Sequence, residues 1–126
     1  MELFYFFNPK NPYPVDSEGK YLHIKKNISS EEQICDLYEQ GLNFPYFGKN
    51  WDALADCLRD LDFIKEKKIL IFHEDIPFEL STEDKKIYVR ILFYVVKHWH
   101  NYPEHKIFVY FPECYKSEIN NLISGF

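Results

Sequence analysis

The sequence predicts an α/β protein with a parallel sheet. From residue 20 onward, the strand-like and helix-like segments follow one another in the order strand, two helices, strand, helix, strand. This order is typical of parallel strands joined by helical crossovers, which are right-handed in nearly all proteins. One strand segment, residues 69–72, is an uninterrupted apolar run (ILIF), as expected for a strand that is buried on both faces of a parallel sheet.

The N-terminal segment predicts an additional strand. Residues 3–7 are aromatic and aliphatic, whereas residues 8–19 contain three prolines and a glycine, so they form neither a helix nor a central strand. Residues 21–26 alternate again as a strand does. We expect this second strand to pair antiparallel with the first as a wide hairpin.

The first helix follows the second strand. Ser29 or Ser30 begins it, because Ser29 and Glu32 have the spacing of a capping box, and its apolar stripe extends up to Gly41.

The second half of the chain predicts two further helices and a strand. Thr82 caps a long helix that extends to about His100. Its apolar positions recur at helical spacing: Ile87, Ile91, Leu92, Val95 and Trp99. Residues 107–111 form the last strand, which Pro112 ends. Residues 113–123 form a terminal helix that packs through Tyr115, Ile119 and Leu122.

The composition fits a single domain that spans residues 1–126. Of these residues 46% are apolar and 19% are aromatic, which is enough to fill one core, and there is no internal repeat or low-complexity run. The net charge of −5 opposes binding to phosphate backbones, which requires clustered Lys and Arg. We therefore expect a basic protein as the partner, and no nucleic acid.

The N-terminus and the cysteines indicate a cytoplasmic protein. The apolar run before Asn8 is too short for a secretory signal or a membrane span, so no membrane contact is expected. Cys35, Cys57 and Cys114 are odd in number, lack CxxC spacing and each lie within an apolar pattern, which favours buried free thiols over a disulfide or a catalytic thiol. We expect a monomer without a metal or a cofactor.

The stretch of residues 44–62 (FPYFGKNWDALADCLRDLD) stands out from the rest of the chain. Pro45 and Gly48 mark an irregular turn, and Asn50 is placed to cap a helix over residues 51–61. One face of this helix is apolar and carries Leu54, Cys57, Leu58 and Leu61. The opposite face carries Asp52, Asp56, Arg59 and Asp60. Folding alone does not require this arrangement, because acids at successive i+4 steps repel each other.

The acidic face favours binding over catalysis. Acid–base catalysis by Asp52 and Asp56 would need different pKa values created by burial, and an exposed helix does not provide this. A merely solvated face is the plainer alternative. However, Tyr46, Phe47 and Trp51 surround the acids, and aromatic residues beside charges frequently anchor protein interfaces.

The same stretch resembles the barstar family. The matching residues are Pro45, Tyr46, Phe47, Gly48, Asn50, Asp52, Ala53, Leu54, Asp56, Cys57 and Leu58. The likeness extends more loosely over residues 20–111. It implies a three-stranded parallel sheet packed with helices. Residues 1–19, which carry the antiparallel N-terminal strand, and residues 113–126, which carry the C-terminal helix, are extensions without a counterpart in the family. The likeness also implies a non-enzymatic intracellular inhibitor, whose helix and preceding turn plug the active site of a secreted ribonuclease.

The resemblance implies that the acidic helix imitates RNA phosphates in the active site of a basic ribonuclease or nuclease toxin, as in an immunity protein of a toxin–antitoxin pair. The expected partner-binding residues are Tyr46, Phe47, Gly48, Asn50, Trp51, Asp52, Asp56 and Asp60. Asp56 is expected to make the deepest ion pair and Asp52 a second one. Tyr46 would supply a ring contact, and the backbone of Gly48 would permit close approach.

Three positions depart from the family pattern. Lys49 stands where an acid is usual, Ala55 replaces a bulky Trp, and Lys97 aligns near an acid of the long helix. These differences weaken the case for barnase itself as the target and are compatible with a toxin nuclease that has a different surface. A non-inhibitory protein–protein interaction module that binds a basic partner is the alternative.

Overall fold

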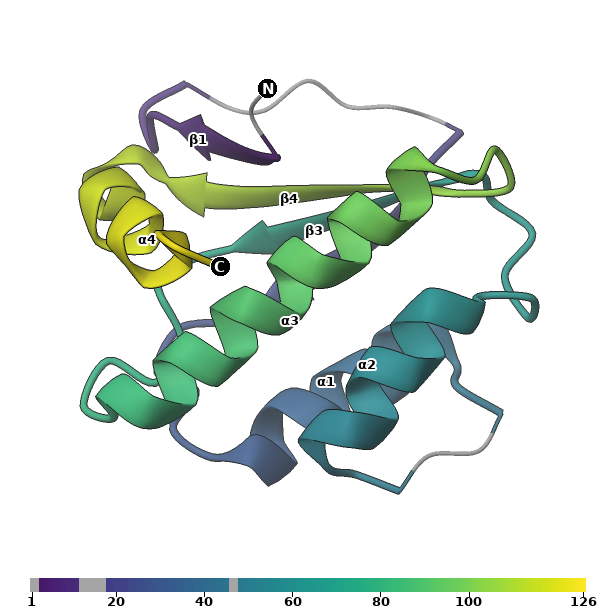
Figure 1. The fold of residues 1–126 in the computed structure, drawn as a ribbon, viewed down its shortest axis with the longest axis horizontal. Helices are drawn as coiled ribbons and strands as arrows, with labels where there is room; N and C mark the ends of the chain where they lie inside the picture. Colours follow the sequence, from purple (N-terminus) through teal and green to yellow (C-terminus); the bar gives the residue numbers. More distant parts are fainter. Residues whose placement is uncertain (1–2, 12–17, 46–47) are drawn as a thin grey trace.

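The computed structural model describes residues 3–11, 18–45 and 48–126 (Figure 1). Its elements are β1 (Phe4–Phe7), β2 (Lys20–Ile24), α1 (Glu31–Leu42), α2 (Trp51–Asp60), β3 (Lys68–His73), α3 (Thr82–His100), β4 (Lys106–Pro112), the 3-10 helix η1 (Glu113–Tyr115) and α4 (Lys116–Ile123). The structure confirms the predicted order of strand, two helices, strand, helix, strand.

The sheet has four strands in the order β1-β4-β3-β2, and all neighbouring pairs are parallel. The predicted hairpin is therefore wrong, because β1 does not pair antiparallel with β2. It pairs parallel with β4 at the opposite edge, where Phe4 lies next to Val109 in the register. Aromatic packing provides a physical reason: the Phe4 ring contacts Phe111 of β4 at a centroid distance of 5.7 Å and Phe93 of α3 at 6.2 Å.

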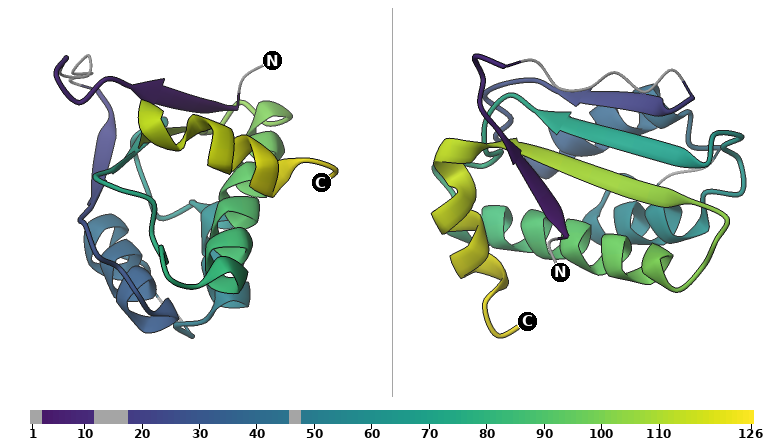
Figure 2. Two further views of the ribbon diagram at one scale, coloured as in Figure 1. Left: turned by 90° about the vertical axis from the view of Figure 1, so that its left-hand side faces the viewer. Right: turned by 90° about the horizontal axis from the view of Figure 1, so that it is seen from above.

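Helices α1, α2 and α3 lie on the same face of the sheet, as the two views in Figure 2 show. The core lies between these layers and contains Ile69, Ile71, Val109 and Phe111, all 0% exposed. The opposite face carries a row of stacked rings: Tyr5, Tyr110, Phe72 and Tyr21. Leu70 and Phe72 are buried there, which confirms that β3 is buried on both faces.

One helix cap agrees with one of the two predicted serines, and another cap differs from the prediction. Ser30 caps α1, because its side chain accepts a hydrogen bond from the Gln33 amide, and the Gln33 side chain accepts one from the Ser30 amide. The predicted box of Ser29 and Glu32 is therefore shifted by one residue. Likewise, Ser81 rather than Thr82 caps α3.

Of the apolar positions predicted for the long helix α3, Leu92, Val95 and Trp99 are buried, as expected. Its buried residues are Lys85, Tyr88, Val89, Leu92, Val95, Val96 and Trp99. Ile87 and Ile91 are only half-buried on its outer side, contrary to the prediction. Helix α4 packs against α3 as well: Ile119 is fully buried, and Lys85 pairs with Glu118 at 2.6 Å.

A buried polar chain connects the sheet to two helices. The Tyr110 carbonyl can only accept, so neutral His73 donates to it from Nδ1 (2.9 Å) and accepts at Nε2 from the Tyr88 hydroxyl (2.6 Å). The Tyr88 oxygen then accepts from the Tyr38 hydroxyl (2.8 Å). Burial lowers the pKa of His73 to about 3 and raises the pKa of both tyrosines, so this chain stays neutral.

The three thiols do not share one environment. Cys35 and Cys57 are buried, as predicted, and burial raises the pKa of Cys35 to about 12. Cys114 is exposed, contrary to the prediction, because it follows β4 in the surface turn η1. Within the described ranges, no three His, Cys, Asp or Glu residues are grouped as metal ligands are, and no helix is long and apolar enough to cross a membrane.

Candidate functional site: the acidic face of helix α2

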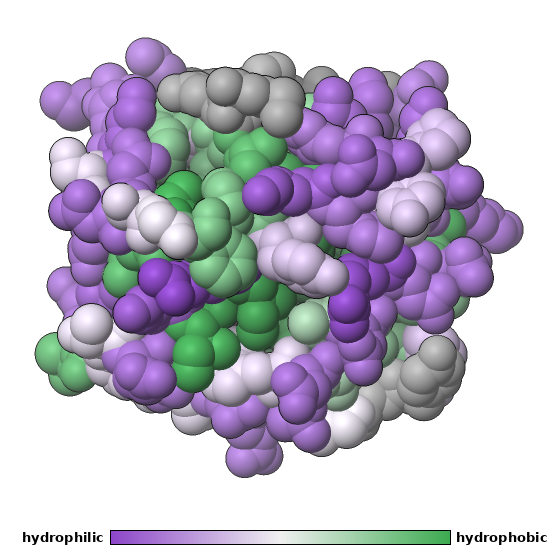
Figure 3. All heavy atoms as spheres, viewed as in Figure 1, coloured by the Kyte–Doolittle hydropathy of each residue, from purple (hydrophilic) through white to green (hydrophobic). Residues whose placement is uncertain are grey.

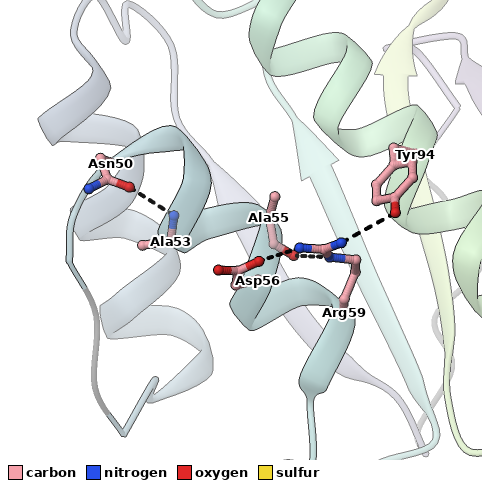
Figure 4. A network of polar contacts seen from close by, with 6 residues as sticks. All are labelled: Asn50, Ala53, Ala55, Asp56, Arg59 and Tyr94. Carbon is pink, nitrogen blue, oxygen red and sulfur yellow. Dashed lines mark hydrogen bonds and ion pairs between the residues drawn. The ribbon is translucent and has the colours of Figure 1, made fainter.

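Local signals in the sequence define helix α2. The Asn50 side chain accepts a hydrogen bond from the Ala53 amide at 2.8 Å, which satisfies a free amide of the first turn (Figure 4). Leu61 adopts a left-handed conformation and ends the helix one residue before the predicted end. Leu54 and Leu58 are 0% exposed, so the apolar face packs into the core as predicted.

The opposite face of α2 carries its acids toward the outside. Asp52 and Asp56 are exposed and Asp60 is half-buried. Successive acids are four residues apart, which separates them by about 6 Å along the helix axis. Asp52 lies in the first turn, where the helix dipole favours a negative charge. The face is therefore a short, regularly spaced row of carboxylates.

Arg59 pairs with the central acid of this row. Its Nη2 donates to Asp56 Oδ1, its Nε donates to the Ala55 carbonyl (3.3 Å), and its Nη1 donates to the Tyr94 hydroxyl of α3 (3.2 Å) (Figure 4). The guanidinium carbon also lies 5.3 Å from the centre of the Tyr94 ring. The hydrogen bond to Tyr94 raises the pKa of Arg59 further, so this cation is permanent.

Trp51 connects the start of α2 to the core. Its ring is half-buried, with centroids 5.4 Å from Phe78 and 6.3 Å from Tyr88. Its amide donates to Glu31 Oε2 of α1 at 2.8 Å. The ring thus lies inward, beside the buried polar chain, and these contacts fix where the acidic row begins.

The turn before α2 is described in part. The predicted contact residues Tyr46 and Phe47 lie outside the described residues. Gly48 is exposed and lacks a positive φ, whereas Lys49 adopts a φ of 54°. The Lys49 ammonium lies 3.1 Å from Asp36 of α1, and this hydrogen bond and ion pair raise its pKa.

The other two unusual positions, Ala55 and Lys97, lie on different helices. Ala55 is half-buried and supplies the carbonyl that holds Arg59. Lys97 is exposed on α3, with its ammonium 5.2 Å from the centre of the Phe93 ring.

Tyr94 also borders an apolar hollow on the outer side of α3. The hollow is lined by Ile87, Arg90, Ile91, Tyr94 and Phe126. Figure 3 shows apolar side chains gathered in the middle of this face, where α3 crosses it. An apolar surface therefore adjoins the Asp56–Arg59 pair.

Negative charge is concentrated around α1 and α2, which lie next to each other (Figure 1). Residues 31–62 contain eight acidic and two basic residues, whereas the whole chain contains 20 and 15. This segment therefore holds more negative charge than the chain's net −5, and the remaining residues are close to neutral.

Sequence reasoning found the acids but missed their partners. The i+3 spacing of Asp56 and Arg59 was a visible signal for their pair. Tyr94 and Glu31 come from other helices, so no local pattern indicated them.

The family model described as "Barstar (barnase inhibitor)" matches residues 20–111. No curated protein and no solved structure matches the chain. The matched range covers β2 to β4 and includes α2 with its cap, and it leaves out β1 and α4. The match extends over more than half of the sequence, and so the chain belongs to the Barstar (barnase inhibitor) family, whose members are ribonuclease inhibitors and not enzymes.

Proposed function

We propose that this protein inhibits a ribonuclease, such as a nuclease toxin for which it is the immunity protein, by placing the acidic face of α2 in the active site inside the cell. The observation that carries this proposal is the concentration of negative charge in residues 31–62, with Asp52 and Asp56 exposed on α2. Family membership supplies the class of partner, and the charge indicates the surface.

The mechanism is imitation of the substrate. A ribonuclease binds the phosphates of RNA with Arg, Lys and His side chains, and these groups also bind carboxylates. A helix that presents carboxylates at regular steps occupies the same groups but offers no phosphodiester to cleave. Opposite charges on the two proteins also accelerate their encounter.

Asp56 is suited to the central contact. One of its oxygens binds Arg59, while the side chain remains 70% exposed. The other oxygen can therefore accept from a cation of the nuclease. Asn50 and Trp51 act differently in this proposal, because the cap and the inward ring hold α2 in position. Contacts by Tyr46, Phe47 and the Gly48 backbone remain predictions.

Affinity capture from the native cell tests the proposal. The native protein as bait should retain a basic protein with ribonuclease activity, and excess bait should abolish that activity. The double variant Asp52→Asn, Asp56→Asn, used as bait, should retain much less of this ribonuclease. Glu83→Gln is the matched control, because Glu83 is an exposed acid in the first turn of α3. Capture of a basic protein without nuclease activity would instead indicate a non-inhibitory interaction module.

Binding kinetics with the captured nuclease then test the assigned surface. Asp56→Ala should weaken binding by more than roughly 2 kcal/mol, mainly through faster dissociation, because a cation of the partner loses its counter-charge. Asp60→Ala should cost less, since Asp60 is half-buried. Salt should slow association steeply. Equal affinities for both variants and the native protein would place the interface elsewhere.

A further inference from the structure

A pocket of about 520 Å³ lies at the carboxyl ends of the strands, the end that faces the viewer in the left view of Figure 2. It is lined by residues at or after the ends of all four strands, among them Phe7, Lys26, Glu74, Asp75, Pro112 and Cys114. None of the described residues that line it belongs to α1 or α2, so the pocket is separate from the acidic face of α2.

The topology favours a ligand at this place. In open parallel sheets, ligands bind outside the carboxyl ends of strands where the connections of neighbouring strands diverge. Phe7 and Pro112, the last residues of β1 and β4, are paired in the register and both line the pocket. Beyond these residues the chain leads from β1 to β2 at the far edge of the sheet, but from β4 into η1 and α4.

Opposite charges share the wall of this pocket: the charge of Lys26 favours the ionised form of Asp75, although no direct ion pair joins these two described residues. Among the described residues, the Lys26 ammonium has no hydrogen bond or ion pair. Asp75 Oδ2 accepts a hydrogen bond from the Asn27 amide (3.1 Å), while its Oδ1 is buried without a partner in the described part of the chain. Glu74 holds His23 at 2.6 Å through one oxygen. Burial is the largest influence on the pKa of Asp75 and raises it despite the charge of Lys26, so a second nearby cation would further stabilise the charged form of Asp75.

We propose that this pocket binds a small zwitterion, namely a free α-amino acid with a large apolar side chain. The carboxylate of the ligand pairs with Lys26, its ammonium lies beside the carboxylates of Glu74 and Asp75, and its side chain packs on Phe7 and Tyr115. The volume lies within the range of roughly 300–1,000 Å³ that is usual for small-molecule sites. A ligand with a single charge would pair either with Lys26 or with the carboxylates of Glu74 and Asp75, but not with both.

Three probes test this proposal by nuclear magnetic resonance of the ¹⁵N-labelled protein: L-phenylalanine, 3-phenylpropionate and phenethylamine. L-Phenylalanine should produce saturable shifts at the amides that line the pocket in the millimolar range. The two single-charge analogues should bind about fivefold more weakly, because each lacks one ion pair.

Variants separate the two charges. Lys26→Met should weaken the binding of L-phenylalanine about fivefold and leave the binding of phenethylamine unchanged. Asp75→Asn should weaken the binding of L-phenylalanine and leave the binding of 3-phenylpropionate unchanged. Lys25→Met is the control, because the neighbouring lysine does not line the pocket. The amide spectrum of each variant also shows whether it is folded. Shifts that do not saturate, that lie elsewhere, or that are equally strong for all three probes would overturn the proposal.

Discussion

Replacing His73 with glutamine is expected to remove most of the decrease in the free energy of unfolding that this histidine causes at acidic pH. His73 is 0% exposed and is held neutral between the Tyr110 carbonyl and the Tyr88 hydroxyl. Glutamine has both a donor and an acceptor but does not titrate, so the variant isolates the proton from much of the hydrogen bonding.

The magnitude follows from the pKa of His73, which is about 3 in the folded protein and 6.5 ordinarily. Between these values the unfolded chain binds a proton that the native state excludes, so the free energy of unfolding decreases as the pH falls. The decrease is about 2 kcal/mol at pH 5 and about 4 kcal/mol near pH 3. Above about pH 6.5 this residue contributes no pH dependence.

Chemical denaturation at pH 7 and pH 5 measures this effect. From pH 7 to pH 5, the free energy of unfolding should decrease by about 2 kcal/mol more for the native protein than for His73→Gln. At pH 7 itself, the variant should be less stable than the native protein. His100→Gln is the control, because His100 is exposed at the end of α3 and should leave the pH dependence of the native protein in place. Equal losses for the native protein and His73→Gln would refute the reasoning, since native His73 would then accept a proton as readily as the unfolded chain.

Three further predictions concern packing and charge. Leu58→Ala should lower the free energy of unfolding by roughly 2–5 kcal/mol, because the Leu58 side chain is fully buried. Asp56→Ala should change it by less than about 1 kcal/mol, because the Asp56 side chain is 70% exposed. Chemical denaturation of both variants measures the difference. Gly41→Ala should destabilise the fold by roughly 1–3 kcal/mol, because a Cβ at this position would lie 2.1 Å from a side chain of β2. Gly48→Ala should change the stability by less than about 1 kcal/mol, because the nearest atoms to a Cβ there lie at 3.5 Å. Thermal unfolding tests both variants. Arg59→Ala should speed association with the captured nuclease and steepen its salt dependence in stopped-flow measurements, because it removes a cation from the acidic face; slower association would mean that Arg59 contacts an acid of the partner.

Helix α2 could be predicted from the sequence because its signals are local. The Asn50 cap, the apolar spacing and the outward acids each depend on residues a few positions apart, and the structure has them within one residue of the prediction. The cap of α1 shows the limit of such signals. Two adjacent serines were both suitable, and the residue three positions after Ser30, Gln33, decided between them.

The pairing of β1 could not be predicted because the partner of a strand is decided far away in the sequence. A hairpin with β2 and a parallel ladder with β4 both satisfy the apolar pattern of residues 3–7. The packing of Phe4 between Phe111 and Phe93 distinguishes them, and this contact exists only once α3 and β4 have assembled.

The candidate site was predictable in its charges but not in their environment. Asp56 was expected to repel its acidic neighbours, yet it is paired with Arg59, which in turn is held by Tyr94 from α3. Trp51 was expected among the exposed rings, and the structure places its ring against Phe78. Both differences arise from the packing of α2 on α3 and on the core, which an isolated helix pattern does not contain.

The anchoring of Arg59 bears directly on how α2 would enter a basic site. Arg59 is fixed by the Ala55 carbonyl and the Tyr94 hydroxyl, so its position does not depend on Asp56 alone. A nuclease cation that binds the remaining oxygen of Asp56 would therefore add to the existing pair and need not replace it. The Asp56 and Arg59 side chains would not have to change conformation, and a surface that is already ordered loses little conformational entropy on binding. In the proposed complex, the acidic helix would thus be arranged before the nuclease binds, while its exposed ion pair contributes little to folding.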